Sequence, residues 1–451
     1  MHAKRSLVVG LGLSGAAAAE RLVAEGFEVT AVDDNCSDGA RQRAEALGID
    51  LLDAPDPGVL AKVARSADQV VVSPGVAASH PIFGLGLGDR LVGEVELAFR
   101  RMNVPVIAVT GTNGKTTVVT LVEAMLRASG VEVRAAGNIG RPLMEVAGTS
   151  SGVVVAEVSS FQLALTRDFH PSVATWLNFA PDHLDWHPDL CHYRRSKEMI
   201  WQNARPGDIA VANVEDPVVL AASARVVAAG AGLVGFGLDA GDWHVSGGRL
   251  LAPGGTEIVR AAELVRRFPH DLANSLAAAA TACSAGASLE GCRAALLRFR
   301  GLPHRLELVG EAGGVRFYDD SKATTPASVL AALRGFHSVV LIAGGRNKGL
   351  ELSELRAASG CIRAVVAIGE AAPEIVAVFS GACPVEAASS MEAAVAAAVR
   401  LSSRGDAVVL SPGCASFDWY SSYAERGDEF VRCLRLAGVG PAGAHSGEED
   451  G

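Results

Sequence analysis

The chain has 451 residues and a formal net charge of -10, with 49% hydrophobic and 20% charged residues. This composition is that of a globular protein with room for about three domains of roughly 150 residues each. An acidic chain without a basic run disfavours nucleic acid and anionic membranes as partners, so we expect small-molecule substrates. The 8 cysteines include no CxxC pair, which favours reduced thiols in a cytosol over disulfides or a zinc site.

The N-terminal segment is basic and then apolar, as a secretory signal would be. However, its glycines have the spacing of a phosphate loop, and the apolar run ends at Glu20. No stretch approaches the roughly 18 consecutive apolar residues that a membrane-spanning helix needs. We therefore expect a cytoplasmic protein that does not contact a membrane, and we expect a monomer.

Residues 1–103 alternate short β-branched runs with helical segments, beginning with "SLVVG", "AAAAERLVAEG" and "FEVTAVDD". This alternation predicts a parallel sheet with crossover helices. The segment "GEVELAFRRMN" at 93–103 has the pattern of an amphipathic helix, and it places the first domain boundary near Asn103.

A second α/β block, expected at 104–302, starts with the strand "VPVIAVTG" and the helix "TTVVTLVEAML", and a glycine-punctuated stretch at 242–259 predicts hairpins. A third alternating block follows at 303–438 and includes "VRFYDDS", "SVVLIAGG" and "AVVLSPG". The polar residues 439–451 cannot bury anything and are expected to be a disordered tail.

The first motif is "GLGLSG", with Gly10, Gly12 and Gly15, followed by Asp33 at the end of a predicted strand. Glycines at this spacing let a diphosphate approach a helix N-terminus, and an acidic residue at this separation is typical of a dinucleotide site. Taken alone, this motif favours an NAD-dependent oxidoreductase.

The second motif, "GTNGKTT" at 111–117, lies between a strand and a helix. Backbone N–H groups at the helix start favour an anion, Lys115 adds a positive charge, and Thr116 offers a hydroxyl to Mg²⁺. This motif favours a nucleoside triphosphate, and a nucleotide-binding switch protein is an alternative to an enzyme.

Two further segments carry groups suited to a metal or a phosphate. Glu157 ends a run that predicts a central strand, where ligands of parallel sheets bind, and a carboxylate there suits Mg²⁺ or a salt bridge. The loop "NFAPDHLDWHPDLCHY" gathers acidic residues and histidines without zinc-ligand spacing. Lys197 lies on the following helix and, from the pattern alone, is a solvated lysine.

In the third block, three polar clusters each follow a predicted strand, so all three can converge on one sheet edge. They are "YDDSKATTP", "GGRNKG" and "SPGCASFDWY". Any one of them could be ordinary turn chemistry, because Asp, Ser and Gly dominate turns.

With these residues in hand, the chain resembles the Mur ligase family over nearly its whole length. The motifs are "GTNGKTT", "EVSSFQL", "NFAPDHLDWH", "HDLANSLAA", "GLPHRLE", "DDSKATTP" and "LSPGCASFDWY", in family order. The resemblance implies an α/β fold of three domains: a Rossmann-like N-terminal domain for a UDP-linked substrate, a central P-loop ATPase-type domain, and a C-terminal Rossmann-like domain for the amino acid.

"SSFQL" and "DSKAT" resemble the member that adds D-glutamate to UDP-N-acetylmuramoyl-L-alanine, a cytoplasmic step of peptidoglycan precursor synthesis. The resemblance implies ATP as a substrate, two Mg²⁺ ions and a CO2-derived carbamate on Lys197. The reaction would pass through an acyl phosphate. A folylpolyglutamate synthetase-like ligase is a closer alternative, which should lack the UDP-binding domain.

The resemblance also implies a role for each matching residue. Catalysis would involve Lys115, Glu157, His183, Lys197 and Lys322. ATP would contact Gly111, Thr112, Asn113, Gly114, Lys115, Thr116, Thr117, Asn274, Arg305 and Asp320. The UDP-linked substrate would contact Leu13, Ser14, Asp33, Asp34, Ser73, Pro74, Gly75 and Asn138. D-glutamate would contact Lys322, Thr324, Lys348, Ser416 and Phe417, and the metal ligands would be Thr116, Glu157, His183 and the carbamate on Lys197.

Overall fold

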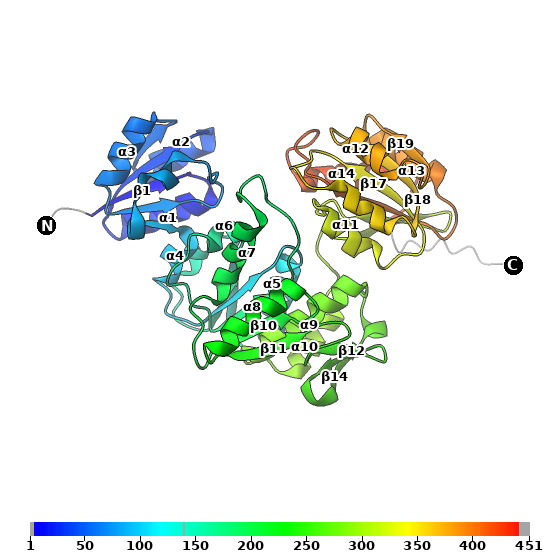
Figure 1. Ribbon diagram of the computed structural model, residues 1–451, viewed down its shortest axis with the longest axis horizontal. Helices are drawn as coiled ribbons and strands as arrows, with labels where there is room; N and C mark the ends of the chain where they lie inside the picture. Colours follow the sequence, from blue (N-terminus) through cyan, green and yellow to red (C-terminus); the bar gives the residue numbers. More distant parts are fainter. Residues whose placement is uncertain (1–3, 139, 442–451) are drawn as a thin grey trace. The chain divides into compact units, whose positions relative to one another are not determined.

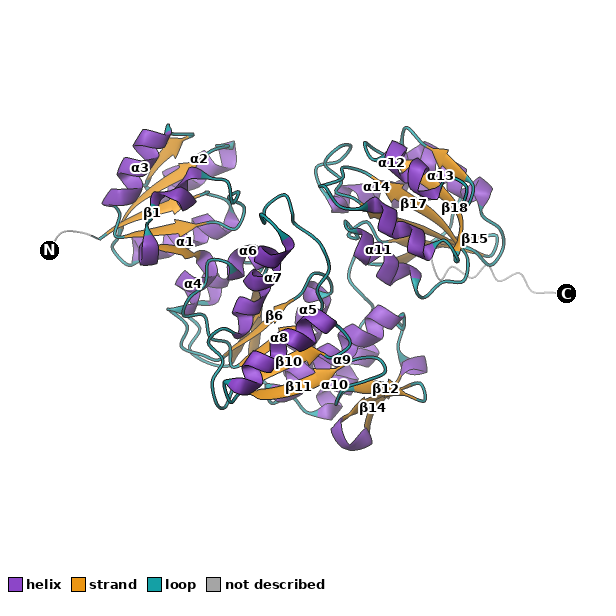
Figure 2. Ribbon diagram, in the orientation of Figure 1, coloured by secondary structure: helices purple, strands orange, loops and turns teal. Residues whose placement is uncertain are grey.

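The structure is a computed structural model that describes residues 4–138 and 140–441 (Figure 1). The chain forms two compact units. The first unit comprises Met1–Phe179, Trp186–Val265 and Leu272–Phe299, and the second comprises Ala180–Asp185, Arg266–Asp271 and Arg300–Gly451. Strands and helices alternate along both units (Figure 2), which confirms the predicted α/β class.

The first sheet of the first unit is parallel and has the strand order β3-β2-β1-β4-β5. Its strands are β1 (Arg5–Val9), β2 (Glu28–Asp33), β3 (Asp50–Asp53), β4 (Gln69–Val72) and β5 (Leu91–Gly93). The helices are α1 (Leu13–Ala24), α2 (Asp38–Leu47), α3 (Pro57–Ser66) and α4 (Glu94–Phe99), with the 3-10 helices η1 (Pro81–Leu85) and η2 (Gly88–Arg90). The strand order reverses between β1 and β4, which is where ligands bind in such sheets.

Local sequence determines where these helices begin and end. The Asp56 side chain accepts hydrogen bonds from the first free N–H groups of α3, and proline occupies the first turn, where no N–H is needed. Ser37 caps α2 in the same way, and Gly48, at φ 62°, ends it in the left-handed conformation that glycine adopts without strain.

The second sheet of the first unit is also parallel, with the order β11-β10-β9-β6-β8-β7. Its strands are β6 (Val106–Thr110), β7 (Val133–Gly137), β8 (Val153–Glu157), β9 (Val173–Trp176), β10 (Ile209–Asn213) and β11 (Gly232–Phe236). The helices are α5 (Lys115–Ala128), α6 (Ser160–Leu163), α7 (Leu190–Glu198), α8 (Pro217–Ala228), α9 (Pro269–Ser284) and α10 (Leu289–Arg298), with η3 (Leu143–Val146), η4 (Met199–Trp201) and η6 (Ala261–Glu263). The predicted hairpins form a separate antiparallel sheet of β12 (His244–Ser246), β13 (Arg249–Ala252) and β14 (Thr256–Arg260), with η5 (Pro253–Gly255).

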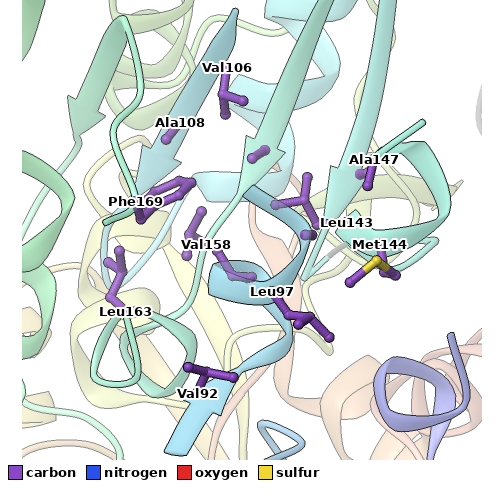
Figure 3. Packing of buried hydrophobic residues seen from close by; sticks show 14 of the residues in the cluster. Val92, Leu97, Val106, Ala108, Leu143, Met144, Ala147, Val158, Leu163 and Phe169 are labelled. Atoms are coloured by element: carbon purple, nitrogen blue, oxygen red, sulfur yellow. The ribbon is translucent and has the colours of Figure 1, made fainter. Parts of the chain in front are cut away.

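Helix α4 joins the first sheet to the second through a shared hydrophobic core. Residues of both sheets belong to one buried cluster, and Figure 3 shows Leu97 of α4 packed near Leu143 and Met144. The helix was predicted to be amphipathic, but it is buried on every side from Glu94 to Ala98. The prediction was wrong because the polar positions of the pattern are glutamates that point into the protein and not into water.

Those two glutamates are bonded very differently. Glu96 accepts hydrogen bonds from the backbone N–H groups of residues 167–169 and from Arg100. Glu94 accepts the backbone N–H of Met144 at 2.6 Å, and its other oxygen has no hydrogen-bond partner among the described residues. Burial raises the pKa of Glu94 to about 7.

The sheet of the second unit has the order β15-β16-β20-β17-β18-β19 and is parallel except for β15. Its strands are β15 (Glu307–Ala312), β16 (Val315–Asp319), β17 (Val339–Gly344), β18 (Ile362–Ile368), β19 (Val385–Ala387) and β20 (Ala407–Gly413). Its helices are α11 (Pro326–Leu333), α12 (Ala372–Phe379), α13 (Met391–Leu401) and α14 (Tyr423–Leu436), with η7 (Leu352–Ala358).

The predicted tail begins too early. Val439 is buried, and the N–H of Glu311 in β15 donates to the carbonyl of Gly440, so the chain still packs on the sheet there. Residues 442–451 of that predicted tail lie outside the described residues. Among the residues that the structure describes, no helix is long and apolar enough to cross a membrane.

Candidate functional site

A cavity of about 690 Å³ lies at the reversal point of the first sheet. It is bounded by the turns that follow β1, β2 and β4. Seven residues predicted to contact the UDP-linked substrate line it: Leu13, Ser14, Asp33, Asp34, Ser73, Pro74 and Gly75. Leu13, 66% exposed at the start of α1, offers an apolar surface to a flat ring.

Hydrogen bonds fix the shape of this cavity. The Asp33 carboxylate accepts the N–H groups of Leu11 and Asn35, so it organises the turn after β1 as well as facing the cavity. The Ser73 hydroxyl donates to the carbonyl of Gly10 at 2.6 Å and draws the turn after β4 against the turn after β1. A Cβ on Gly15 would lie 1.9 Å from that carbonyl, so only glycine fits there.

His80, which the sequence did not single out, completes the wall. Its Nδ1 accepts the N–H of Ile82, which places the ring proton on Nε2. Nε2 lies 3.1 Å from a carboxylate oxygen of Asp34. His80 therefore orients the exposed carboxylate of Asp34 in the cavity.

The predicted phosphate loop runs from the end of β6 into α5. Its Gly114 has φ 84°, which favours glycine, and a Cβ there would lie 2.5 Å from the Oδ1 atom of Asn274. The structure thereby brings Asn274 of α9 against this loop, although the two are far apart in sequence. Lys115 begins α5, and its Nζ donates to the loop carbonyls of Gly111 and Thr112.

Lys197 is not the solvated lysine that its helical pattern suggested. It is 1% exposed, and its Nζ donates to the carbonyl of Gly111 at 2.8 Å and lies 4.7 Å from the ring centre of Tyr193. The pattern was misleading because the buried face of α7 consists of Tyr193, Ser196 and Lys197, two of which are polar. Lys197 therefore reaches the phosphate loop.

Two residues that hold the loop were missed at the sequence level. Asn178 accepts the N–H of Thr112 through its carbonyl and the N–H of Asn113 through its side chain, and its amide donates to the carbonyl of Asn113. The Tyr193 hydroxyl lies 3.1 Å from the hydroxyl of Thr112. The available signals were that Asn178 closely follows β9, the neighbour of β6, and that Tyr193 precedes Lys197 by one helical turn.

Glu157 ends β8, beside β6, and is buried. One carboxylate oxygen accepts the Asn138 side-chain amide at 2.9 Å. The other is buried and has no hydrogen-bond partner among the described residues. A buried, unsatisfied carboxylate oxygen beside a phosphate loop fits a divalent cation, because it is costly without a partner and Mg²⁺ prefers carboxylate and phosphate oxygens.

In the second unit, the three predicted clusters follow β16, β17 and β20, which are neighbours in the sheet. Arg426 of α14, missed at the sequence level, ties two of them together: its guanidinium donates to Ser321 and to the carbonyls of Cys414 and Ala415. Burial lowers the pKa of Arg426 to about 10. Because these hydrogen bonds cross from the end of β16 to the end of β20, these two clusters share one sheet edge.

The carboxylates after β16 have distinct surroundings. Asp320 accepts the Ser411 hydroxyl and the N–H of Leu306, and burial raises its pKa to about 7. Asp319 accepts His304 Nδ1 at 2.6 Å, and this hydrogen bond raises the pKa of His304. Asp320 is therefore held at the loop that carries Arg305.

The predicted amino-acid residues lie at the same edge. The Lys322 ammonium is 3.7 Å from the ring centre of Tyr423, and the Lys348 ammonium is 5.9 Å from that of Phe417. Phe417 is 56% exposed, whereas Ser416 is buried and Thr324 is half-buried. His183, also in the second unit, has φ 56°, and its N–H donates to the Asp182 side chain.

The sheet-edge cavity, the lysine-bearing phosphate loop and the buried carboxylate define a nucleotide-binding α/β protein. Residues 109–282 match the Mur ligase middle domain, and residues 304–414 match the Mur ligase glutamate ligase domain. The chain belongs to the Mur ligase family, whose members use ATP and Mg²⁺.

Relatives and a solved structure agree with this assignment. The UDP-N-acetylmuramoylalanine–D-glutamate ligase of Frankia casuarinae is 42% identical over 449 residues, covering 95% of this chain and 93% of the relative. The enzyme of the same name from Rubrobacter xylanophilus is 42% identical over 445 residues, covering 95% and 98%. The crystal structure of the UDP-N-acetylmuramate–alanine ligase of Thermotoga maritima has a TM-score of 0.61 at 18% identity, covers 97% of this chain and 100% of that one, and so shows a shared fold.

Proposed function

We propose that this protein is an ATP-dependent ligase that joins D-glutamate to UDP-N-acetylmuramoyl-L-alanine in peptidoglycan precursor synthesis. The observation that carries the proposal is the full-length similarity, at 42% identity, to ligases named for this reaction. The cavity of the first sheet supports it, because a UDP-binding domain distinguishes this ligase from a folylpolyglutamate synthetase-like one. The NAD-dependent oxidoreductase alternative leaves the phosphate loop and the sheet of the second unit without a role.

Each of the three predicted domains has its own role in the proposal. Residues 1–103 bind the UDP moiety in the cavity lined by Leu13 and Asp34. Residues 104–302 bind ATP through the phosphate loop, and residues 303–438 bring the amino acid through the clusters at the edge of their sheet. We propose that the protein acts in the cytoplasm as a monomer on these small-molecule substrates.

The reaction begins with two anions that must meet. The alanyl carboxylate attacks the γ-phosphorus of ATP and the bond to the β,γ-bridging oxygen breaks. The products of this step are an acyl phosphate and ADP. Lys115 and the N–H groups at the start of α5 offset the repulsion by holding the phosphates. Thr116, Glu157, His183 and modified Lys197 would hold the two Mg²⁺ ions, which would supply positive charge opposite the phosphate oxygens.

The second step forms the amide. The neutral D-glutamate amine attacks the acyl carbon, phosphate leaves, and the amine loses its proton. Lys322 and Lys348 bind the carboxylates of D-glutamate, with Thr324, Ser416 and Phe417 around them, and positioning of the amine supplies most of the rate gain. Asn274, Arg305 and Asp320 hold ATP, and Asn138 binds the muramoyl part of the substrate.

The surroundings of Lys197 support the proposed carbamate. Its Nζ is buried and lies against the phosphate loop, so a carbamate would offer a carboxylate to a Mg²⁺ ion beside the phosphates. The modification forms a bond between the neutral amine and CO2 and releases one proton. Mass spectrometry of the intact protein under CO2 would show it as an added carboxyl group.

Phosphate release tests the function directly. The purified protein is incubated with ATP, Mg²⁺, UDP-N-acetylmuramoyl-L-alanine and D-glutamate, and each component is left out in turn. We expect phosphate release that requires both acceptor substrates. Release with neither acceptor would point to a nucleotide-binding switch protein, and release with a folate in place of the UDP-linked substrate would point to the folate alternative.

A further inference from the structure

Trp186, in the loop between β9 and α7, reaches the wall of the cavity at the edge of the first sheet. Its indole N–H donates to the backbone carbonyl of Val76 at 2.8 Å, between residues 110 positions apart in sequence. Val76 lines the cavity and follows Ser73, Pro74 and Gly75 in the turn after β4. The indole therefore holds the turn after β4 (the cavity turn), which Ser73 ties to the glycine turn after β1, where the diphosphate is expected.

The indole is itself held by two rings. Phe161 of α6 lies 4.9 Å away between ring centres, and His187 lies 4.7 Å away at an interplanar angle of 67°. Helix α6 begins shortly after Glu157, at the end of β8. Trp186 therefore joins the cavity turn to the segment that carries the buried carboxylate.

The backing of the indole is rigid. His187 is buried, its Nε2 lies 2.9 Å from the Ser160 hydroxyl, and its Nδ1 lies 2.8 Å from Nδ1 of His192. Turning the imidazole would break both hydrogen bonds, so the ring beside Trp186 stays in place. In supporting the indole, His187 and His192 act through these hydrogen bonds and do not have to bind a metal or a substrate.

We propose that Trp186 is a positioning residue for the UDP-linked substrate, an inference that rests on the proposed function. The substrate spans the two ends of this connection, because its diphosphate is expected at the glycine turn that Ser73 ties to the cavity turn, and its alanyl carboxylate must reach ATP at the phosphate loop. Trp186 keeps the cavity turn at the distance that the substrate requires. Losing its hydrogen bond weakens binding of the UDP-linked substrate and leaves ATP binding unchanged.

Trp186→Phe tests this, because it keeps an aromatic ring and removes the N–H. We expect the KM for UDP-N-acetylmuramoyl-L-alanine to rise about 3- to 10-fold, the usual effect of one lost hydrogen bond. The kcat and the KM values for ATP and D-glutamate should stay within about 2-fold of wild type. Trp201→Phe is the matched control, since Trp201 also donates its indole N–H to a backbone carbonyl, that of Ala174 at 3.0 Å, but in the core; its KM values should not change.

An unchanged KM for the UDP-linked substrate in Trp186→Phe would overturn the proposal, as would an equal rise in the KM for ATP. Should that variant not fold, Phe161→Leu loosens the indole without removing its N–H and must raise the same KM; no rise there also overturns the proposal. Failure of the proposed function would appear separately, as wild type without D-glutamate-dependent phosphate release. Calorimetry with UDP alone would then decide: weaker binding to Trp186→Phe than to wild type supports the role, and equal binding refutes it.

Discussion

Glu94→Gln should change how the stability of the protein depends on pH. Glu94 is 1% exposed on α4, and its pKa is raised from 4.5 to about 7 by burial. The folded state therefore holds this proton more tightly than the unfolded state does. Its stabilising contribution is fully present below pH 4.5 and is lost as the pH rises through 7.

The size of the effect follows from the two pKa values. Between pH 5 and pH 8, a shift from 4.5 to about 7 removes about 2.5 kcal/mol of unfolding free energy. Glutamine keeps an oxygen for the N–H of Met144 but cannot ionise. Between pH 5 and pH 8, the unfolding free energy of the variant should therefore fall by about 2.5 kcal/mol less than that of wild type. Any constant cost of the buried amide cancels in this comparison.

Urea unfolding monitored by tryptophan fluorescence at pH 5 and pH 8 measures the difference for both proteins. Glu123→Gln is a control, because Glu123 pairs with Arg127 on the surface of α5 and lies outside this core. The reasoning is refuted if wild type and Glu94→Gln lose the same free energy between the two pH values.

Three further variants test the site. Lys115→Met should fold and lower kcat at least about 100-fold, because the phosphates lose their nearest cation; phosphate release measures this, and near wild-type turnover would contradict the role. Lys197→Ala should be inactive and partly rescued by a short-chain carboxylic acid that replaces the proposed carbamate; active wild-type enzyme whose mass shows a bare lysine would count against the modification. Asp319→Asn should destabilise the protein by about 2 kcal/mol at pH 6 and by less at pH 9. The hydrogen bond to Asp319 raises the pKa of His304, so this pair stabilises the folded state only while the imidazole is protonated. Equal losses of unfolding free energy at both pH values in urea unfolding would contradict this.

Much of the fold was predictable because parallel sheets place their functional groups at strand ends. The glycine spacing after β1 and the acidic pair after β2 located residues that now line one cavity. The adjacency of β16, β20 and β17 likewise explains why three separate polar clusters share an edge. These positions depend on chain order and strand polarity, which sequence patterns report.

What the sequence could not show depends on burial of polar groups. Glu96 resembles a surface residue, yet it accepts three backbone N–H groups of another segment. Arg426 is a helix residue whose role appears only once the ends of β16 and β20 are adjacent. Such contacts join segments far apart in sequence, and hydropathy assigns their side chains to the solvent.

The hydrogen bonds from Asn178 affect the entropy of nucleotide binding. Its backbone carbonyl and side-chain amide hold Thr112 and Asn113 before any phosphate arrives. Ordering a flexible residue costs about 1–2 kcal/mol in backbone entropy, and here that cost is met when the protein folds. Nucleotide binding therefore loses little of its free energy to ordering of the loop. A binding site made of glycine and short polar residues can thus be as rigid as the sheet that carries it.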